Sequence, residues 1–145
     1  MPILIMLDID YKILKILYRS SKFLKVGQLA RNLKLPHSTI GSCVKRLENE
    51  KLVIYERYKP VILSNKGIDL AKELIRHAQL LELLLFKELN LRAEEAHEES
   101  EKFNLLFSCN TINKICEKYG HPKECPCGEN ILNSNNCFCE DLKEN

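Results

Sequence analysis

The sequence lacks the long apolar run that a membrane-spanning helix requires. No stretch of about 18 consecutive apolar residues occurs, although 45% of the 145 residues are hydrophobic and 29% are charged. The first ten residues, MPILIMLDID, have neither the basic start nor the small-residue cleavage site of a secretion signal. We therefore expect a cytoplasmic protein of one or two small domains, with no membrane partner.

The sequence also lacks the motifs of common enzyme classes. It contains no H-E-x-x-H pair, no phosphate-binding loop and no evident nucleophile–base pair. Its few histidines, His37, His77, His97 and His121, are scattered, and no internal repeat is apparent. We expect that the protein is not an enzyme.

Charge divides the chain into a basic and an acidic half. Residues 1–66 carry 13 lysines and arginines against 5 acidic residues, a net charge of +8, whereas residues 67–145 have a net charge of −6. Ordinary solvated charge does not explain this segregation. A basic amino-terminal half suits a module that binds phosphates, and the acidic half is expected to face away from DNA.

The stretch from Pro36 to Leu63 predicts a helix followed by a small hairpin. Apolar residues between Ile40 and Leu52 recur at steps of three to five residues, so they can share a buried face. The opposite face is short, polar and basic, as suits a helix that lies in a DNA major groove. Two strand-like runs, 53–57 and 60–63, then form a hairpin, or wing, with a basic tip. The residues expected to contact DNA are Ser38, Thr39, Ser42, Lys45 and Arg46 on the helix, and Arg57 and Lys59 on the wing.

Two further helices precede this stretch. Helical spacing of apolar residues predicts helices over Asp8–Arg19 and Val26–Leu33, and a tight turn then leads to Pro36, which fits the first turn of the next helix. A short helix, a brief turn and a second helix make a helix-turn-helix unit. With the hairpin, the sequence predicts a winged helix-turn-helix.

The second half of the sequence predicts more helices. Ser64–Gly67 interrupts the pattern, and a long helix over Ile68–Leu89 follows, apolar nearly all round. We expect that helix to form a homodimer interface; the alternative is that helices of the same chain cover it. Further helices are predicted over Arg92–Phe107 and Thr111–Tyr119, the last ending at Gly120.

These segments define a mainly α fold in three parts. Residues 1–66 form a winged-helix DNA-binding domain, residues 67–120 a helical dimerisation domain, and residues 121–145 a cysteine-rich tail.

The ordered set of segments resembles the diphtheria-toxin-repressor-like (DtxR/MntR) metal-dependent transcriptional regulators, over about residues 8–128. The segment from VGQLARNL to the S-x-K-G-x-x-x-A run at Ser64–Ala71 is similar to the DNA-binding half of that family. The segment HAQLLELLLFKELNL is similar to its dimerisation helix, AHEESEKF to the next helix, and HPKECPCGENI to its P-x-x-C-P-H-G ending. The resemblance implies a homodimeric repressor that binds a palindromic operator when Fe(II) or Mn(II) is bound.

The sequence departs from the family at the metal ligands. Ala78 stands where the family usually has a histidine, and Glu101 is followed by Asn104 and Leu105 where the family has Glu-His. The ordinary metal site therefore lacks most of its donors. A family-type Fe(II) or Mn(II) site rebuilt from three residues stays an alternative, and those residues are His77, Glu98 and Glu101.

Cysteines supply a different set of candidate ligands. Six of the seven cysteines lie at or after Cys109, and four of these follow a C-x-C, nine residues, C-x-C pattern: Cys125, Cys127, Cys137 and Cys139. Four thiolates can hold an iron–sulfur cluster, which we favour, or Zn2+; free or disulfide-bonded thiols are the remaining alternative. Cys43, Cys109 and Cys116 are interpreted as core residues.

The sequence as a whole predicts a homodimeric DNA-binding repressor that responds to iron, an iron–sulfur cluster or another metal through its carboxyl-terminal cysteines. An alternative from another class is a redox or metal-handling protein that uses its winged helix for protein contacts.

Overall fold

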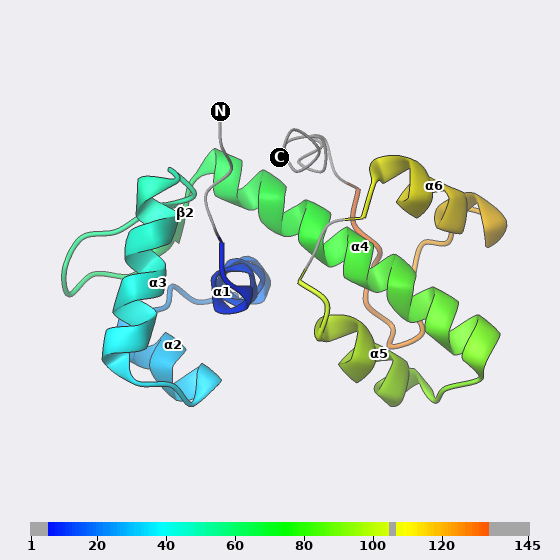
Figure 1. Cartoon of the computed structure of the whole chain (residues 1–145), viewed down its shortest axis with the longest axis horizontal. Coiled ribbons are helices and arrows are strands. Elements are labelled where there is room, and N and C mark those ends of the chain that lie inside the picture. The colour runs from blue at the N-terminus through cyan, green and yellow to red at the C-terminus, as the bar shows by residue number, and fades with distance from the viewer. Residues whose placement is uncertain (1–5, 105–106, 134–145) are drawn as a thin grey trace. The chain divides into compact units, whose positions relative to one another are not determined.

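The structure is a computed structural model and describes residues 6–104 and 107–133. Its fold is mainly helical with one two-stranded sheet (Figure 1), as expected. The chain divides into two compact units, Met1–Ala71 and Lys72–Asn145. The helices are α1 (Asp8–Arg19), α2 (Val26–Leu33), α3 (His37–Asn49), α4 (Asn65–Leu89), α5 (Ala93–Glu101) and α6 (Cys109–Lys118), and the strands are β1 (Val53–Ile54) and β2 (Ile62–Leu63).

None of the described helices has the length and apolar character to cross a membrane.

The first unit is a three-helix core with a hairpin. The helices α1 and α2 have the bounds that the sequence predicts, and α3 begins one residue after Pro36, which is its N-cap. Ile13 of α1, Leu29 of α2 and Leu47 of α3 are fully buried. The apolar periodicity therefore identifies the inner face of α3 correctly, whereas α1 buries the charged residues Asp10 and Lys15 beside its apolar ones.

The hairpin is shorter than the sequence suggests. Val53 pairs with Leu63 and Ile54 with Ile62 in antiparallel register, and Leu24 adds an isolated bridge to Val61. Beyond these pairs the chain turns, with Tyr58 at a φ of +69°. A bulky residue in the left-handed region cannot continue a strand, so the tip becomes a turn that presents its side chains to solvent.

The break predicted at Ser64–Gly67 is wrong, because α4 begins there. The Ser64 hydroxyl accepts a hydrogen bond from the Gly67 N–H at 3.0 Å and so caps the helix. The same hydroxyl donates a hydrogen bond to the Lys51 carbonyl at 2.7 Å. A Cβ on Gly67 would lie 2.0 Å from the Leu52 carbonyl oxygen. Gly67 is thus required by close packing against the backbone rather than by a turn.

The second unit surrounds the carboxyl-terminal part of α4, with α5 and α6 on either side of it in Figure 1. Leu80 of α4 packs with Ile112 and Cys116 of α6 in a buried cluster. The helix α5 ends at Glu101, well before the predicted Phe107. The N–H groups of residues 102 and 103 donate to the carbonyls of residues 99 and 100, and these shorter-range hydrogen bonds tighten the last turn. The helix α6 ends before Gly120, whose φ is +74°, as expected.

The buried side of α4 is not purely apolar. Four polar side chains of this helix are almost fully buried, at 1–2% exposure: Glu73, His77, Gln79 and Glu82. Burying such groups is costly unless each has a partner. Their partners define the candidate site described below.

Two of the helical glycines of the first unit, Gly67 and Gly41, provide a matched test of packing. We expect Gly67→Ala to destabilise the protein by about 1–3 kcal/mol, because the new methyl group meets the backbone at Leu52. Gly41→Ala in α3 meets no atom within 4 Å and should stabilise by up to about 1 kcal/mol. Urea unfolding of the two variants measures both effects, and equal stabilities would contradict this account.

Candidate nucleic-acid interface and metal centre

The outer face of α3 carries the predicted DNA-contacting residues. Ser38, Ser42 and Lys45 are exposed, and Thr39 is half-buried. The Ser42 hydroxyl donates to the Ser38 carbonyl at 3.0 Å, which leaves its oxygen available as an acceptor. These side chains are short enough for the helix to approach a base edge closely.

Arg46 lies differently from its neighbour Lys45. Its guanidinium donates to both oxygens of the Asp10 carboxylate, from Nε at 3.0 Å and from a terminal nitrogen at 3.1 Å. Asp10 is fully buried and also accepts the Leu7 N–H at the start of α1, at 2.8 Å. Arg46 therefore joins α3 to α1, and in this arrangement its charge is directed at a carboxylate rather than at solvent.

The wing presents further cations. Arg57 and Lys59 are exposed at its tip, where the Arg57 guanidinium lies 4.9 Å from the centre of the Tyr58 ring. Lys59 forms an exposed ion pair with Glu56 at 3.0 Å, which is weak enough to exchange for a phosphate. The tip is therefore cationic, as the sequence predicts.

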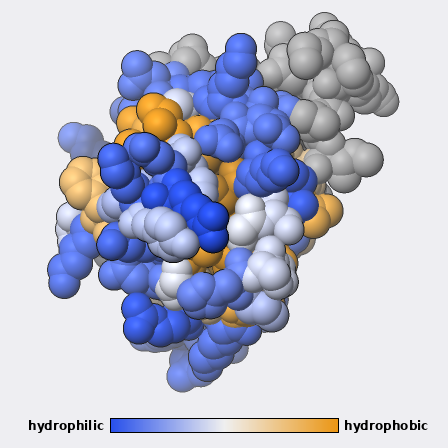
Figure 2. All heavy atoms as spheres, turned by 90° about the vertical axis from the view of Figure 1, so that its left-hand side faces the viewer, coloured by the Kyte–Doolittle hydropathy of each residue, from blue (hydrophilic) through white to orange (hydrophobic). Residues whose placement is uncertain are grey.

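A groove that the sequence did not reveal lies between α2, the start of α3 and the hairpin. Among the described residues that line it, none is acidic. Figure 2 looks onto the side of α2, α3 and the hairpin, where the visible surface is mostly hydrophilic with scattered hydrophobic patches. The polar lining residues of this groove are Lys25, Gln28, Arg31, His37, Tyr55, Arg57 and Tyr58. Such a lining suits a phosphate backbone.

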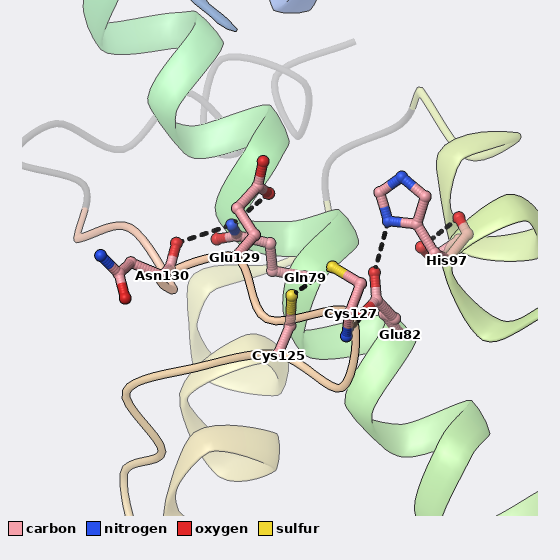
Figure 3. Close-up of polar contacts among 8 residues, drawn as sticks. Gln79, Glu82, His97, Cys125, Cys127, Glu129 and Asn130 are labelled. Carbon is pink, nitrogen blue, oxygen red and sulfur yellow. Dashed lines mark hydrogen bonds and ion pairs between the residues drawn. The ribbon is translucent and has the colours of Figure 1, made fainter. Parts of the chain in front are cut away.

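The candidate metal centre lies in the second unit and is built around Glu82 of α4 (Figure 3). The Glu82 carboxylate contacts Nδ1 of His97 on α5 at 2.8 Å, and it accepts the backbone N–H of Cys127 at 3.1 Å. One donor atom each from Glu82, His97 and Cys127 lie within 4.8 Å of one another. A carboxylate, an imidazole and a thiol at such separations can share one divalent ion.

A short loop brings the cysteines to this centre. The bridge between Glu124 and Asn130 closes it, and the Gly128 N–H donates to the Cys125 carbonyl at 2.8 Å across a tight turn. Gly128 has a φ of +94°, so the turn needs glycine as the sequence suggests. The result places Sγ of Cys125 2.8 Å from Sγ of Cys127.

Gln79 holds this loop against α4. Its amide nitrogen donates to the Glu129 side chain at 2.6 Å and to the Asn130 carbonyl at 2.8 Å, and its oxygen accepts the Leu132 N–H at 2.9 Å. Sequence reasoning missed this role, because a glutamine inside an apolar helix gives no sign of a partner 50 residues away. The loop position is thereby set by a buried, fully bonded side chain.

The thiol of Cys125 is strongly affected by its surroundings. Burial, the Cys127 thiol and then the Glu82 carboxylate together raise the pKa of Cys125 to about 12. Cys125 is 4% exposed, whereas Cys127 is exposed to solvent. The pair thus combines one interior and one accessible sulfur.

The second unit contains another group of side chains of the types that bind metals: Glu73, His77 and Cys109. Nδ1 of His77 accepts the Phe107 N–H at 3.1 Å, which leaves Nε2 to carry the proton towards the Glu73 carboxylate at 3.7 Å. Burial and the nearby Arg76 charge lower the pKa of His77 to about 4, so the ring is neutral. Neither ring nitrogen then offers a free lone pair, and this group is better described as a buried hydrogen-bonded cluster.

The structure separates the sequence-predicted ligands. Cys125 and Cys127 come together, while Cys137 and Cys139 lie outside the described residues. In the described part of the chain, His77 groups with Glu73 and Cys109 rather than with Glu98 and Glu101. Cys43 and Cys116 are buried core residues as interpreted, but Cys109 is half-buried, with Sγ 3.4 Å from the Glu73 carboxylate.

Comparison with known families accounts for both units. A winged helix-turn-helix DNA-binding model matches residues 6–54, and the model described as "Iron dependent repressor, metal binding and dimerisation domain" matches residues 64–133. Together the two models cover most of the chain, which is DtxR/MntR-like in both units. The resemblance seen in the sequence is therefore confirmed.

The chain is also similar to individual proteins of known type. The transcriptional regulator MntR of Bacillus subtilis is 27% identical over 93 residues, which span 64% of this chain and 65% of the relative. The manganese regulator SloR is 29% identical with a TM-score of 0.76, and the match covers 88% of this chain and 60% of that one. A manganese-dependent transcriptional repressor solved with manganese is 25% identical with a TM-score of 0.77 and the same coverages.

The chain thus spans slightly less than two thirds of the length of these relatives. The relatives named are regulators of transcription rather than enzymes.

The contrast between Arg46 and Lys45 gives a stability prediction. Arg46→Ala should lower the free energy of unfolding by about 1–3 kcal/mol, because it leaves the buried Asp10 carboxylate without its charged donor. Lys45→Ala removes an exposed side chain and should change stability by less than about 0.5 kcal/mol. Chemical denaturation measures both variants, and a harmless Arg46→Ala would show that the pair contributes nothing.

Proposed function

We propose that the protein is a metal-dependent, homodimeric DNA-binding repressor of transcription. The observation that carries this proposal is the donor group at Glu82, His97 and Cys127, which lies within the segment matched by the metal-binding and dimerisation domain. The winged helix that precedes it supplies the DNA-binding part. Family membership supports the same conclusion.

DNA contact is assigned to the exposed face of α3 and to the wing. The α3 helix enters the major groove, where Ser38, Ser42 and Lys45 meet bases and phosphates. Arg57 and Lys59 reach the backbone or the adjacent minor groove from the wing. Arg46, which the sequence places among the phosphate contacts, keeps α3 in position through Asp10 and can reach DNA only by leaving that carboxylate.

The homodimer is assigned to one stripe of α4. Leu81, Leu84 and Leu85 are spaced so that they share a helix face, and each remains partly exposed in the single chain. Apolar side chains left half-covered in this way are typical of a subunit interface. Two copies joined there would present two recognition helices to a two-fold symmetric operator.

The metal is assigned to Glu82, His97 and Cys127. These residues come from α4, α5 and the cysteine loop, so an ion bound there ties three segments together. A cluster held only by thiolates, which the sequence favours, has less support, because the described neighbours of Cys127 include a carboxylate and an imidazole. A divalent ion therefore suits the donor set better than an iron–sulfur cluster.

Metal-dependent DNA binding tests the proposal directly. Duplex DNA from the promoter of the protein's own gene should bind more tightly with a divalent metal than with a chelator, as fluorescence anisotropy would show. His97→Gln should remove this metal response, because it removes one of three ligands. Cys109→Ser, in the other group, should keep it.

The same assay tests the DNA-binding face. Lys45→Ala with Lys59→Ala should weaken binding to every sequence, and the slope of log K against log salt should fall by about 0.9 for each lost phosphate contact. Metal binding without any DNA binding would refute the proposal and favour a metal-handling protein instead.

The dimer prediction concerns the leucine stripe. Leu81→Lys with Leu85→Lys should shift the protein to a monomer in sedimentation velocity, because charges at an apolar interface cannot be desolvated cheaply. Lys87→Glu, exposed and off the stripe, is the control and should stay dimeric. A wild-type protein that is monomeric with metal and DNA present would contradict the assignment.

A further inference from the structure

Cys125 is a fourth potential ligand at the Glu82 centre. Its Sγ lies 2.8 Å from Sγ of Cys127, which is already within the donor group. Figure 3 shows the two sulfurs beside one another, with Glu82 and His97 on the Cys127 side. The centre therefore offers one carboxylate, one imidazole and two thiols.

Contacts within the chain hold the cysteine loop and α5 beside Glu82 before any ion binds. The Gly128 turn positions the two cysteines, and Gln79 fastens the loop to α4. One Glu82 oxygen accepts the Cys127 N–H, while the other faces His97. Both the loop and α5 are therefore positioned by the same buried carboxylate, which limits the reorganisation needed for coordination.

The chemistry of this set favours one class of ion. Thiolates and imidazole suit borderline and soft ions such as Zn2+, whereas Mn2+ prefers carboxylate, carbonyl and water oxygens. Mn2+ also forms the weakest complexes in the first-row series. Four N, O and S ligands are the usual number for zinc in a protein.

We propose that Glu82, His97, Cys125 and Cys127 form a four-ligand thiolate site for Zn2+ and that the two cysteines make it discriminate against Mn2+. This inference rests on the proposed function, since it names the ion of the same regulatory site. Each cysteine releases its thiol proton to solvent as its thiolate binds the ion, and no oxidant or reductant is needed. The two cysteines differ in exposure, since Cys125 is buried and Cys127 is exposed.

Cobalt(II) is the probe for the test, because it reports thiolate ligands by colour. The full-length protein is titrated with Co2+ without oxygen, and the sulfur-to-cobalt charge-transfer band is recorded, followed by displacement with Zn2+ or Mn2+. We expect a strong band that Zn2+ removes at one equivalent and that Mn2+ does not remove. Cys125→Ser and Cys127→Ser should each weaken the band and lower Zn2+ affinity by at least about tenfold.

Matched cysteine variants make the result specific. Cys109→Ser alone, and Cys137→Ser with Cys139→Ser, should keep the band and the Zn2+ affinity. Loss of the band in the Cys137→Ser, Cys139→Ser double variant would overturn the assignment. It would point instead to the four-cysteine site that the sequence suggests. Circular dichroism checks folding of Cys125→Ser, and the exposed Cys127→Ser provides an independent variant if that protein fails to fold.

Failure of this inference is distinct from failure of the proposed function. The thiolate site is refuted if Mn2+ displaces Co2+ as efficiently as Zn2+ does and if Cys125→Ser and Cys127→Ser bind Zn2+ with normal affinity. Metal-dependent repression would then still stand. If the band forms as expected but no metal changes DNA binding, the regulatory role is refuted and a zinc site of structural type remains.

Discussion

The buried carboxylate of Glu82 is the constraint on which the second unit depends. A carboxylate at 1% exposure is costly unless its oxygens are bonded, and here an imidazole from α5 and a backbone N–H from the cysteine loop both reach it. These contacts place three segments, far apart in the sequence, around one point. A carboxylate is also a common metal ligand, so the contacts that compensate the burial of Glu82 are the same contacts that bring the donor group together.

The first unit solves a similar problem at Asp10. That carboxylate is fully buried, and Arg46 neutralises it with two hydrogen bonds while also joining α1 to α3. The outer face of α3 is then left to short hydroxyl side chains and Lys45, which can approach a nucleic acid without competing for this pair. In both units, therefore, a buried charge fixes the position of the element that carries the surface chemistry.

The two donor groups of the second unit show that residue type alone does not define a metal site. Glu82 with His97 and Glu73 with His77 are both carboxylate–histidine pairs beside a cysteine. In the second pair, the Phe107 N–H occupies one ring nitrogen and directs the proton of the other to Glu73. A hydrogen bond from a single backbone amide thus separates a buried polar cluster from a candidate metal centre.

The sequence by itself determined the winged helix, the basic face of α3 and wing, and the family, because these depend on local periodicity, turn residues and the order of segments. The sequence misplaced the start of α4, because Ser64 and Gly67 resemble a break between elements when their contacts with the chain at 51–52 are unknown. It also placed the end of α5 too late. Only the tertiary structure decided which ligands meet. Cys127 reaches Glu82 across 45 residues, through a loop held by Gln79, and no local pattern encodes a contact of that range.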